Sequence, residues 1–124
     1  TYSGHPTCCA VAVKNIEILE RENLVDRAAT MGQRLLEGLQ TLLEFPGVGE
    51  VRGLGLMCAV EFVADRETKA PAGIGAQIQN ACIDRGLFSR AVGDILELAP
   101  PLIINEDEVD KIVEIIREAI ISVT

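Results

Sequence analysis

The order of hydrophobic periods along the chain restricts the fold more than any other feature of the sequence. Apolar residues recur at spacings of three and four from Leu24 to Leu42, and again from Val109 to Ile120, which predicts two amphipathic helices. Between them, short apolar segments are separated by glycines and prolines, which is typical of strands and turns. Helices and strands do not alternate regularly. The sequence therefore predicts an α+β fold with a small mixed, mainly antiparallel sheet covered by helices on one face.

Local signals define the remaining elements. Pro6 suits the first turn of a helix that begins buried and ends exposed. Asn23 can cap the second helix, and Asn105 with Glu108 forms a capping-box-like start to the last one. The expected order is a helix over residues 7–20, a helix over 24–42, two strands within 48–63, a surface loop over 65–73, a helix over 74–84, a hairpin over 87–99 and a final helix after 105.

Composition narrows the class of protein. A chain of 124 residues that is 48% hydrophobic has the size and the apolar content of one domain with a single core. The net charge of -8, without a basic cluster, argues against nucleic-acid and anionic-membrane partners. No apolar run approaches the roughly 18 to 20 residues that a membrane span needs, and no secretion signal is visible, so we expect a cytoplasmic protein.

The cysteines do not suggest metal chemistry. The four cysteines have no C-x-x-C spacing, and a single histidine is present to complete a site, so no metal site is expected. Cys8 and Cys9 adjoin small apolar residues at positions 10–12. Core packing is the interpretation we favour for this pair, and redox activity is the alternative.

An anion site is one interpretation of the N-terminal residues. The run Thr-Tyr-Ser-Gly-His-Pro at residues 1–6 directly precedes a helix start. Unpaired backbone N–H groups there, with nearby hydroxyls, suit a phosphate. The alternative is that Ser3 or Thr7 only caps the helix.

The same run resembles a loop of the class III, or omega, aminotransferases, which are pyridoxal-phosphate enzymes of fold type I. This resemblance implies that Thr1 contacts the cofactor phosphate from the neighbouring subunit of a homodimer. Related aminomutases tend to carry Asn in place of His5, so His5 favours the aminotransferases. An aminomutase remains an alternative within the same cofactor class.

Two further segments extend the resemblance over most of the chain. Residues 51–57, Val-Arg-Gly-Leu-Gly-Leu-Met, are similar to a glycine-containing segment of the class, and we interpret Arg52 as a structural ion-pair partner. Residues 89–94, Ser-Arg-Ala-Val-Gly-Asp, imply that Arg90 binds the substrate carboxylate and can swing away when there is none. A guanidinium suits that task, although a solvated or structural Arg90 is the alternative from the residues alone. We interpret Asp94 as a residue of the hairpin turn, without a catalytic role.

The cofactor lysine of the class has no counterpart here. Transamination with this cofactor requires a lysine amine, and Lys14, Lys69 and Lys111 all have settings typical of solvated charges. We therefore expect residues 1–124 to be a single domain, the C-terminal fragment of a longer aminotransferase whose large domain carries the lysine. The parent would move an amino group from an amine or amino acid to a keto acid, and its small domain would contact the large domain and a second subunit. Alone, the chain is expected to bind no pyridoxal phosphate stably and to be inactive; a free-standing α+β binding or regulatory module is the alternative.

Overall fold

A computed structural model describes residues 3–124, so Thr1 and Tyr2 lie outside the described part. The expected order of elements is confirmed, and a short strand lies inside the segment expected to be a loop. The elements are the helices α1 (Pro6–Arg21), α2 (Leu24–Gln40), α3 (Gly75–Asp84) and α4 (Glu106–Val123), the 3-10 helix η1 (Thr41–Glu44), and the strands β1 (Val48–Leu54), β2 (Met57–Asp65), β3 (Ala70–Pro71), β4 (Arg90–Val92) and β5 (Ile95–Leu98).

The sheet has the strand order β1-β2-β5-β4, and β3 pairs with β2 beside this path. Each of these pairings is antiparallel. One row of directly opposed residues crosses the four main strands at Val51, Val60, Leu96 and Ala91. The α+β class with a mainly antiparallel sheet is therefore confirmed.

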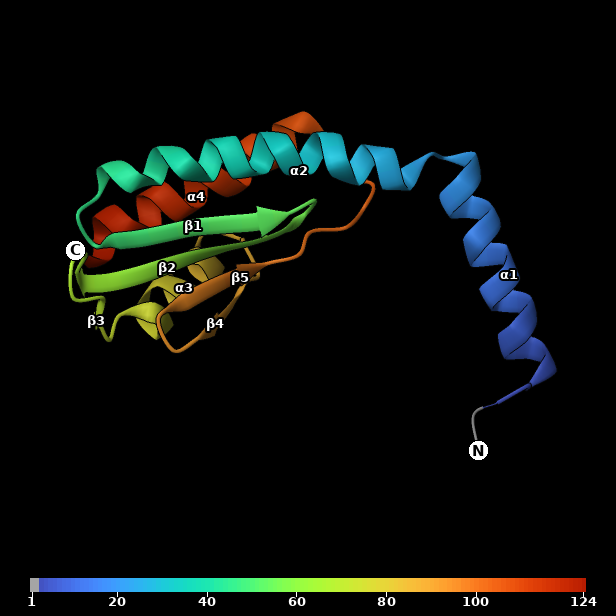
Figure 1. The fold of residues 1–124 in the computed structure, drawn as a ribbon, viewed down its shortest axis with the longest axis horizontal. Helices are drawn as coiled ribbons and strands as arrows, with labels where there is room; N and C mark the ends of the chain where they lie inside the picture. Colours follow the sequence, from blue (N-terminus) through green and yellow to red (C-terminus); the bar gives the residue numbers. More distant parts are fainter. Residues whose placement is uncertain (1–2) are drawn as a thin grey trace.

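This row lies on the face of the sheet that the helices cover. Figure 1 shows α2 and α4 running side by side along the sheet, and α3 contacts α4, β4 and β5. One continuous core joins these elements, because α2 and α4 present apolar stripes at helical spacing to alternate residues of the strands. Burial of each large core side chain contributes about 1.5 to 3 kcal/mol. The largest fully buried side chains include Phe62, Leu35, Leu39, Leu42, Ile78, Leu96, Ile116 and Ile120.

The opposite face of the sheet has no helix over it among residues 3–124. The next row of opposed residues lies there, at Arg52, Ala59, Glu97 and Arg90. Side chains near the β1–β2 turn are also open to solvent, with Leu54 88% exposed. Because neighbouring strand residues point to opposite faces, burial of one row fixes the exposure of the other.

A glycine pair sets the distance between α2 and the β1–β2 turn. Gly55 has φ +55° in this turn, a conformation that glycine adopts without steric cost. A Cβ on Gly32 of α2 would lie 2.1 Å from the carbonyl carbon of Gly55. The backbones of the helix and the turn therefore lie in direct contact at this glycine pair.

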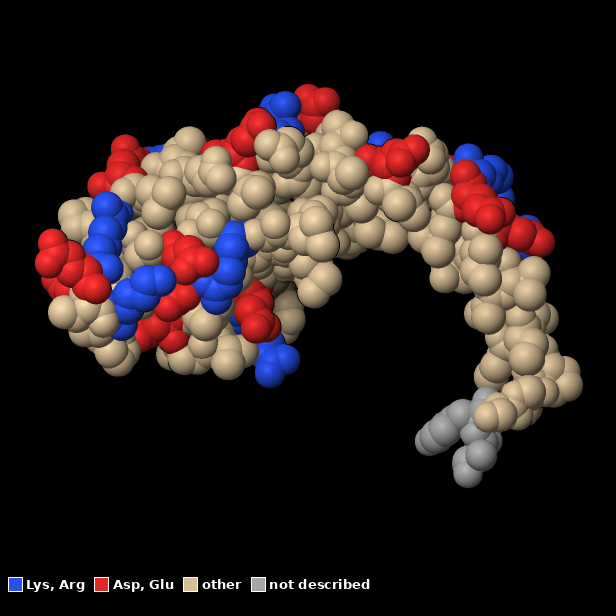
Figure 2. Space-filling model, viewed as in Figure 1, with Lys and Arg blue, Asp and Glu red and all other residues tan. Residues whose placement is uncertain are grey.

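The helix α1 differs from expectation. It has no buried residue, makes its main contact with α2, and projects away from the sheet (Figure 1). Cys8 and Cys9 are exposed, so their expected packing in the core is wrong within this chain, because no described segment lies against them. Charged side chains lie over the sheet, along the upper edge of the view over α2 and α4, and over the later part of α1, whereas the first turns of α1 are uncharged (Figure 2). Among residues 3–124, no helix combines the length and apolarity needed to cross a membrane.

The two expected caps have different outcomes. The capping box of α4 is confirmed, because the Asn105 side chain accepts from the Glu108 backbone N–H at 2.9 Å and Glu108 Oε2 accepts from the Asn105 N–H at 3.0 Å. The Asn23 cap is wrong. Asn23 adopts the left-handed backbone conformation, with φ 50°, in the tight turn between α1 and α2. Its side chain makes no capping hydrogen bond.

Substitution of Gly32 by Ala should destabilise the chain by about 3 kcal/mol, because the methyl group would overlap backbone atoms that cannot rotate away. Thermal unfolding measures the loss. Gly47→Ala is the matched control, because a Cβ there meets no atom closer than 3.9 Å. Equal stability of the two variants would contradict the close packing of α2 on the turn.

Candidate functional site

The N-terminal part of the candidate site is only partly described. Thr1, the expected phosphate contact, lies outside the described residues, and its role stays a prediction. His5 is the N-cap residue of α1 and Pro6 occupies its first position, as the sequence suggests. Within residues 3–124 no side chain caps this helix, so neither Ser3 nor Thr7 fills the capping role. The first-turn N–H groups of α1 therefore remain without a side-chain acceptor in this part of the chain.

Arg52 has the structural role that we expected. Its guanidinium lies 2.7 Å from Glu61 Oε2 and 3.5 Å from Glu50 Oε1, and Lys69 joins the same cluster through Glu50 at 3.3 Å. The hydrogen bond to Glu61 is the main cause of a raised pKa for Arg52. This arginine is held by carboxylates of its own domain.

Arg90 lies in the same row of the open sheet face but has a different environment. It begins the edge strand β4 and is exposed. No carboxylate of residues 3–124 comes within 4.0 Å of its guanidinium. Of the two arginines in the family-like segments, Arg90 is thus the one whose donors are available to an external carboxylate.

A shallow hollow of about 220 Å³ lies beside Arg90. Phe88 and Glu97 are among its lining residues, with Phe88 90% exposed and Glu97 directly across from Arg90 on β5. Sites that enclose a small molecule are usually about 300 to 1,000 Å³. The hollow can therefore hold one end of a ligand, and other walls would have to come from outside the described residues.

The turn of the β4–β5 hairpin is bonded to the start of α3. Asp94 Oδ2 accepts from the Gly73 N–H at 2.8 Å, and Oδ1 accepts from the Ile74 and Gly75 N–H groups at 2.9 and 3.0 Å. A Cβ on Gly75 would lie 2.0 Å from the carbonyl oxygen of Gly93, so the turn and the helix touch through backbone. A carboxylate also suits the partial positive charge of a helix N-terminus. Asp94 therefore joins two elements as well as forming a turn.

A second bond connects α3 to β4 itself. Gln79 Oε1 accepts from the Ala91 N–H at 2.6 Å, next to Arg90. Sequence reasoning missed Gln79 entirely and gave Asp94 a local turn role. The partners in these hydrogen bonds are 12 to 21 residues apart in the sequence. Local sequence patterns do not predict contacts between residues so far apart.

The ionised form of Asp94 is favoured in the folded chain. Partial burial opposes ionisation, but hydrogen bonds from the backbone N–H groups of residues 72–75 outweigh it and lower the pKa of Asp94. The folded protein thus holds this proton less readily than the unfolded chain does, and Asp94 stabilises the fold where its carboxyl is ionised.

The three lysines do not fit the reactive end of pyridoxal phosphate. Lys14 pairs with Glu17 at 2.8 Å, Lys69 with Glu50 at 3.3 Å, and Lys111 with Glu114 at 2.8 Å, each with an exposed side chain. The bond to Glu114 raises the pKa of Lys111, so its amine is held in the protonated, non-nucleophilic form. The uncapped start of α1 fits a phosphate, so the described residues suit one end of the cofactor only.

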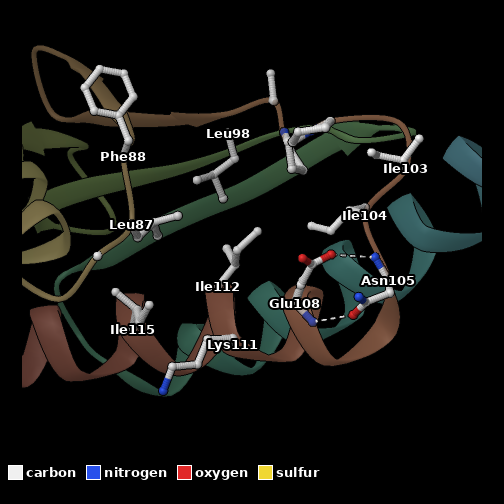
Figure 3. A pocket seen from close by; sticks show the side chains of 14 residues that line it. Leu87, Phe88, Leu98, Ile103, Ile104, Asn105, Glu108, Lys111, Ile112 and Ile115 are labelled. Atoms are coloured by element: carbon white, nitrogen blue, oxygen red, sulfur yellow. Dashed lines mark hydrogen bonds between the residues drawn. The ribbon is translucent and has the colours of Figure 1, made fainter.

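A larger hollow of about 670 Å³ lies between α4 and residues 98–104. Figure 3 shows Leu98, Ile104 and Ile112 facing it, whereas Lys111 is directed away. Asn105 and Glu108 bond to each other's backbone in the capping box, so their polar atoms are already paired. The surface is chiefly apolar, and it lacks the converging polar groups that orient a small substrate.

Metal ligation and chemistry at the two buried thiols find no support in the described part of the chain. No group of three or more His, Cys, Asp or Glu side chains gathers there in a way that could hold a metal ion. Burial raises the pKa of both Cys58 and Cys82, which keeps these thiols protonated.

Replacing Asp94 by Asn should lower the free energy of unfolding at pH 7 by about 2 kcal/mol, because the amide keeps one acceptor oxygen but turns an N–H₂ toward the Gly73 N–H. The contribution of Asp94 is fully present above its unfolded pKa of about 3.9 and is lost as pH falls through its lower folded value. Urea titrations at several pH values should therefore show the two proteins converging below about pH 4. A constant difference down to pH 2 would contradict this assignment.

Comparison with known proteins places these features in a family. The sequence model of class-III aminotransferases matches residues 1–120. An uncharacterised aminotransferase of Sinorhizobium fredii is 45% identical, over 99% of this chain and 28% of that protein. The putrescine–pyruvate aminotransferase of Pseudomonas aeruginosa is 36% identical, over 97% of this chain and 27% of that protein.

Solved structures agree with the sequence comparison. The omega transaminase of Pseudomonas jessenii in complex with PMP superposes with a TM-score of 0.92 and 44% identity, over 97% of this chain and 27% of that one. The chain thus spans only 27 to 28% of the length of these proteins. The fold, the family-like segments and the comparisons agree: the chain belongs to the class-III aminotransferase family.

Proposed function

We propose that this chain is the C-terminal small domain of an aminotransferase that moves an amino group from an amine or amino acid to a keto acid, with pyridoxal phosphate as cofactor. Family membership over residues 1–120 supports the reaction class. The coverage of about a quarter of each relative supports its being one part of a longer protein. A relative named as a putrescine–pyruvate aminotransferase supports an amine donor and a keto-acid acceptor.

In this function Arg90 binds the substrate carboxylate. The observation that carries the proposal is its exposed guanidinium, which no carboxylate of residues 3–124 neutralises, on an open sheet face where Arg52 is neutralised twice. A carboxylate can then accept two parallel hydrogen bonds from the guanidinium. The small hollow beside Arg90 would hold that end of the substrate, and the rest of the enzyme would supply the other walls.

Pyridoxal phosphate would supply the electron-withdrawing ring on which an amino group is transferred. Thr1 would contact its phosphate from the neighbouring subunit, assisted by the free N–H groups at the start of α1. The essential lysine amine would come from the large domain, because the lysines of this chain are exposed and paired. The isolated chain is accordingly inactive and holds no cofactor stably.

The partners of the domain are its own large domain and a second subunit of a homodimer. The exposed apolar residues Val11, Val13 and Ile16 of α1 support such contacts, because a protruding helix with this surface is rarely left in water. We further propose a cytoplasmic location.

Arg90→Ala in the full-length enzyme should raise KM for carboxylate-bearing substrates about a hundredfold, because a charge-assisted bidentate contact is lost. The kcat/KM for amine donors that lack a carboxylate should change little, because a ping-pong reaction separates the donor half-reaction from the carboxylate-bearing keto acid. Steady-state kinetics with both substrate types measures the contrast, and Arg52→Ala is the matched control on the same sheet row. Equal losses for both substrate types would contradict the role of Arg90.

The isolated chain, mixed with pyridoxal phosphate and reduced with borohydride, should give only scattered, substoichiometric adducts on its exposed amines. Mass spectrometry of a proteolytic digest locates them. One stoichiometric adduct at a single lysine, together with transamination activity, would show that this chain carries the chemistry itself.

A further inference from the structure

We propose that Asp94 and Gln79 are positioning residues for Arg90, and that they set how strongly the enzyme prefers substrates with a carboxylate. The inference rests on the proposed role of Arg90. It adds that substrate preference depends on α3, an element whose own side chains do not line the hollow beside Arg90.

The strand that carries Arg90 is weakly held by the sheet. β4 has three residues, lies at the edge, and pairs only with β5 among residues 3–124. A strand this short at an edge frays easily, because one side of its backbone has no strand partner. A guanidinium on a fraying strand would sample many positions, and bidentate binding tolerates little misplacement.

Two groups of hydrogen bonds, which join the hairpin to α3 and to the residues just before it, compensate for this. Gln79 binds the Ala91 N–H, one residue after Arg90, and Asp94 fixes the turn that ends the strand. Close backbone contact between Gly75 and Gly93 leaves the turn no room to slide over the helix. The hairpin is therefore bonded to α3 and to the residues just before it through the Ala91 N–H on β4 and through the Asp94 carboxylate at the turn.

A role in stabilising the fold, without positioning Arg90, is the alternative for Asp94. Asp65 is the matched residue that distinguishes the two roles. Asp65 is also a carboxylate with a lowered pKa, and its Oδ1 accepts from the backbone N–H and the hydroxyl of Thr68, both at 2.7 Å. It lies at the end of β2, in the loop toward β3, and holds no part of the β4–β5 hairpin. Its substitution costs stability without moving Arg90.

The test compares Asp94→Asn, Gln79→Leu, Asp65→Asn and Arg90→Ala in the full-length enzyme. L-Alanine and isopropylamine serve as amino donors, because they differ only by a carboxylate in place of a methyl group. For each variant, the ratio of kcat/KM for alanine to that for isopropylamine is measured. Hydrogen–deuterium exchange of residues 87–98 reports the order of the hairpin, and thermal unfolding confirms that each variant is folded.

We expect Asp94→Asn and Gln79→Leu each to lower the ratio about tenfold and to speed exchange in residues 87–98. Asp65→Asn should leave both unchanged. If Arg90→Ala lowers the ratio but neither α3 contact does, the positioning role is overturned and the proposed function stands. If Arg90→Ala leaves the ratio unchanged, the carboxylate-binding role of Arg90 fails, and the positioning role with it.

Discussion

The helices bury one face of the sheet and leave the other face open, and this asymmetry decides where each side chain of the strands lies. The helices α2, α3 and α4 all pack on the row that contains Val60 and Leu96, and this one core fixes the register of every main strand. The other row must then face outward, and it carries Arg52 and Arg90. An apolar core on one side of the sheet thus places two charged side chains, Arg52 and Arg90, on the other side.

The two arginines on the open face differ in whether carboxylates compensate their charge. Arg52 belongs to a cluster with Glu50 and Glu61, so its charge is already compensated. Arg90 lies at the edge, where the described residues supply no ion pair. The backbone beside it is nevertheless fixed, through Asp94 and Gln79. A free charge on a fixed backbone is what a carboxylate-binding site requires, since binding then costs little ordering entropy.

Local patterns predicted the fold well and the supports of the site poorly. The stripe from Leu24 to Leu42, the capping box at Asn105 and the hairpin around residues 93–94 depend on neighbours in sequence, and the structure confirms them. The prediction that Asn23 caps α2 is wrong, because the tight turn needs its backbone in the left-handed region. The expected burial of α1 is wrong because, among residues 3–124, this helix contacts α2 and does not lie over the sheet, so none of its residues is buried. The contacts of Asp94 and Gln79 cross between elements, so they become visible only once the chain is folded.

We propose that Arg90 presents its guanidinium, from the open face of the sheet, to the carboxylate of the substrate. A crystal structure of the full-length protein with bound propionate checks this role. Both carboxylate oxygens should lie within hydrogen-bond distance of Arg90, with the Asp94 and Gln79 contacts to the hairpin and β4 unchanged. A structure in which a different residue holds the propionate carboxylate, while Arg90 pairs with a carboxylate of the protein, would contradict it.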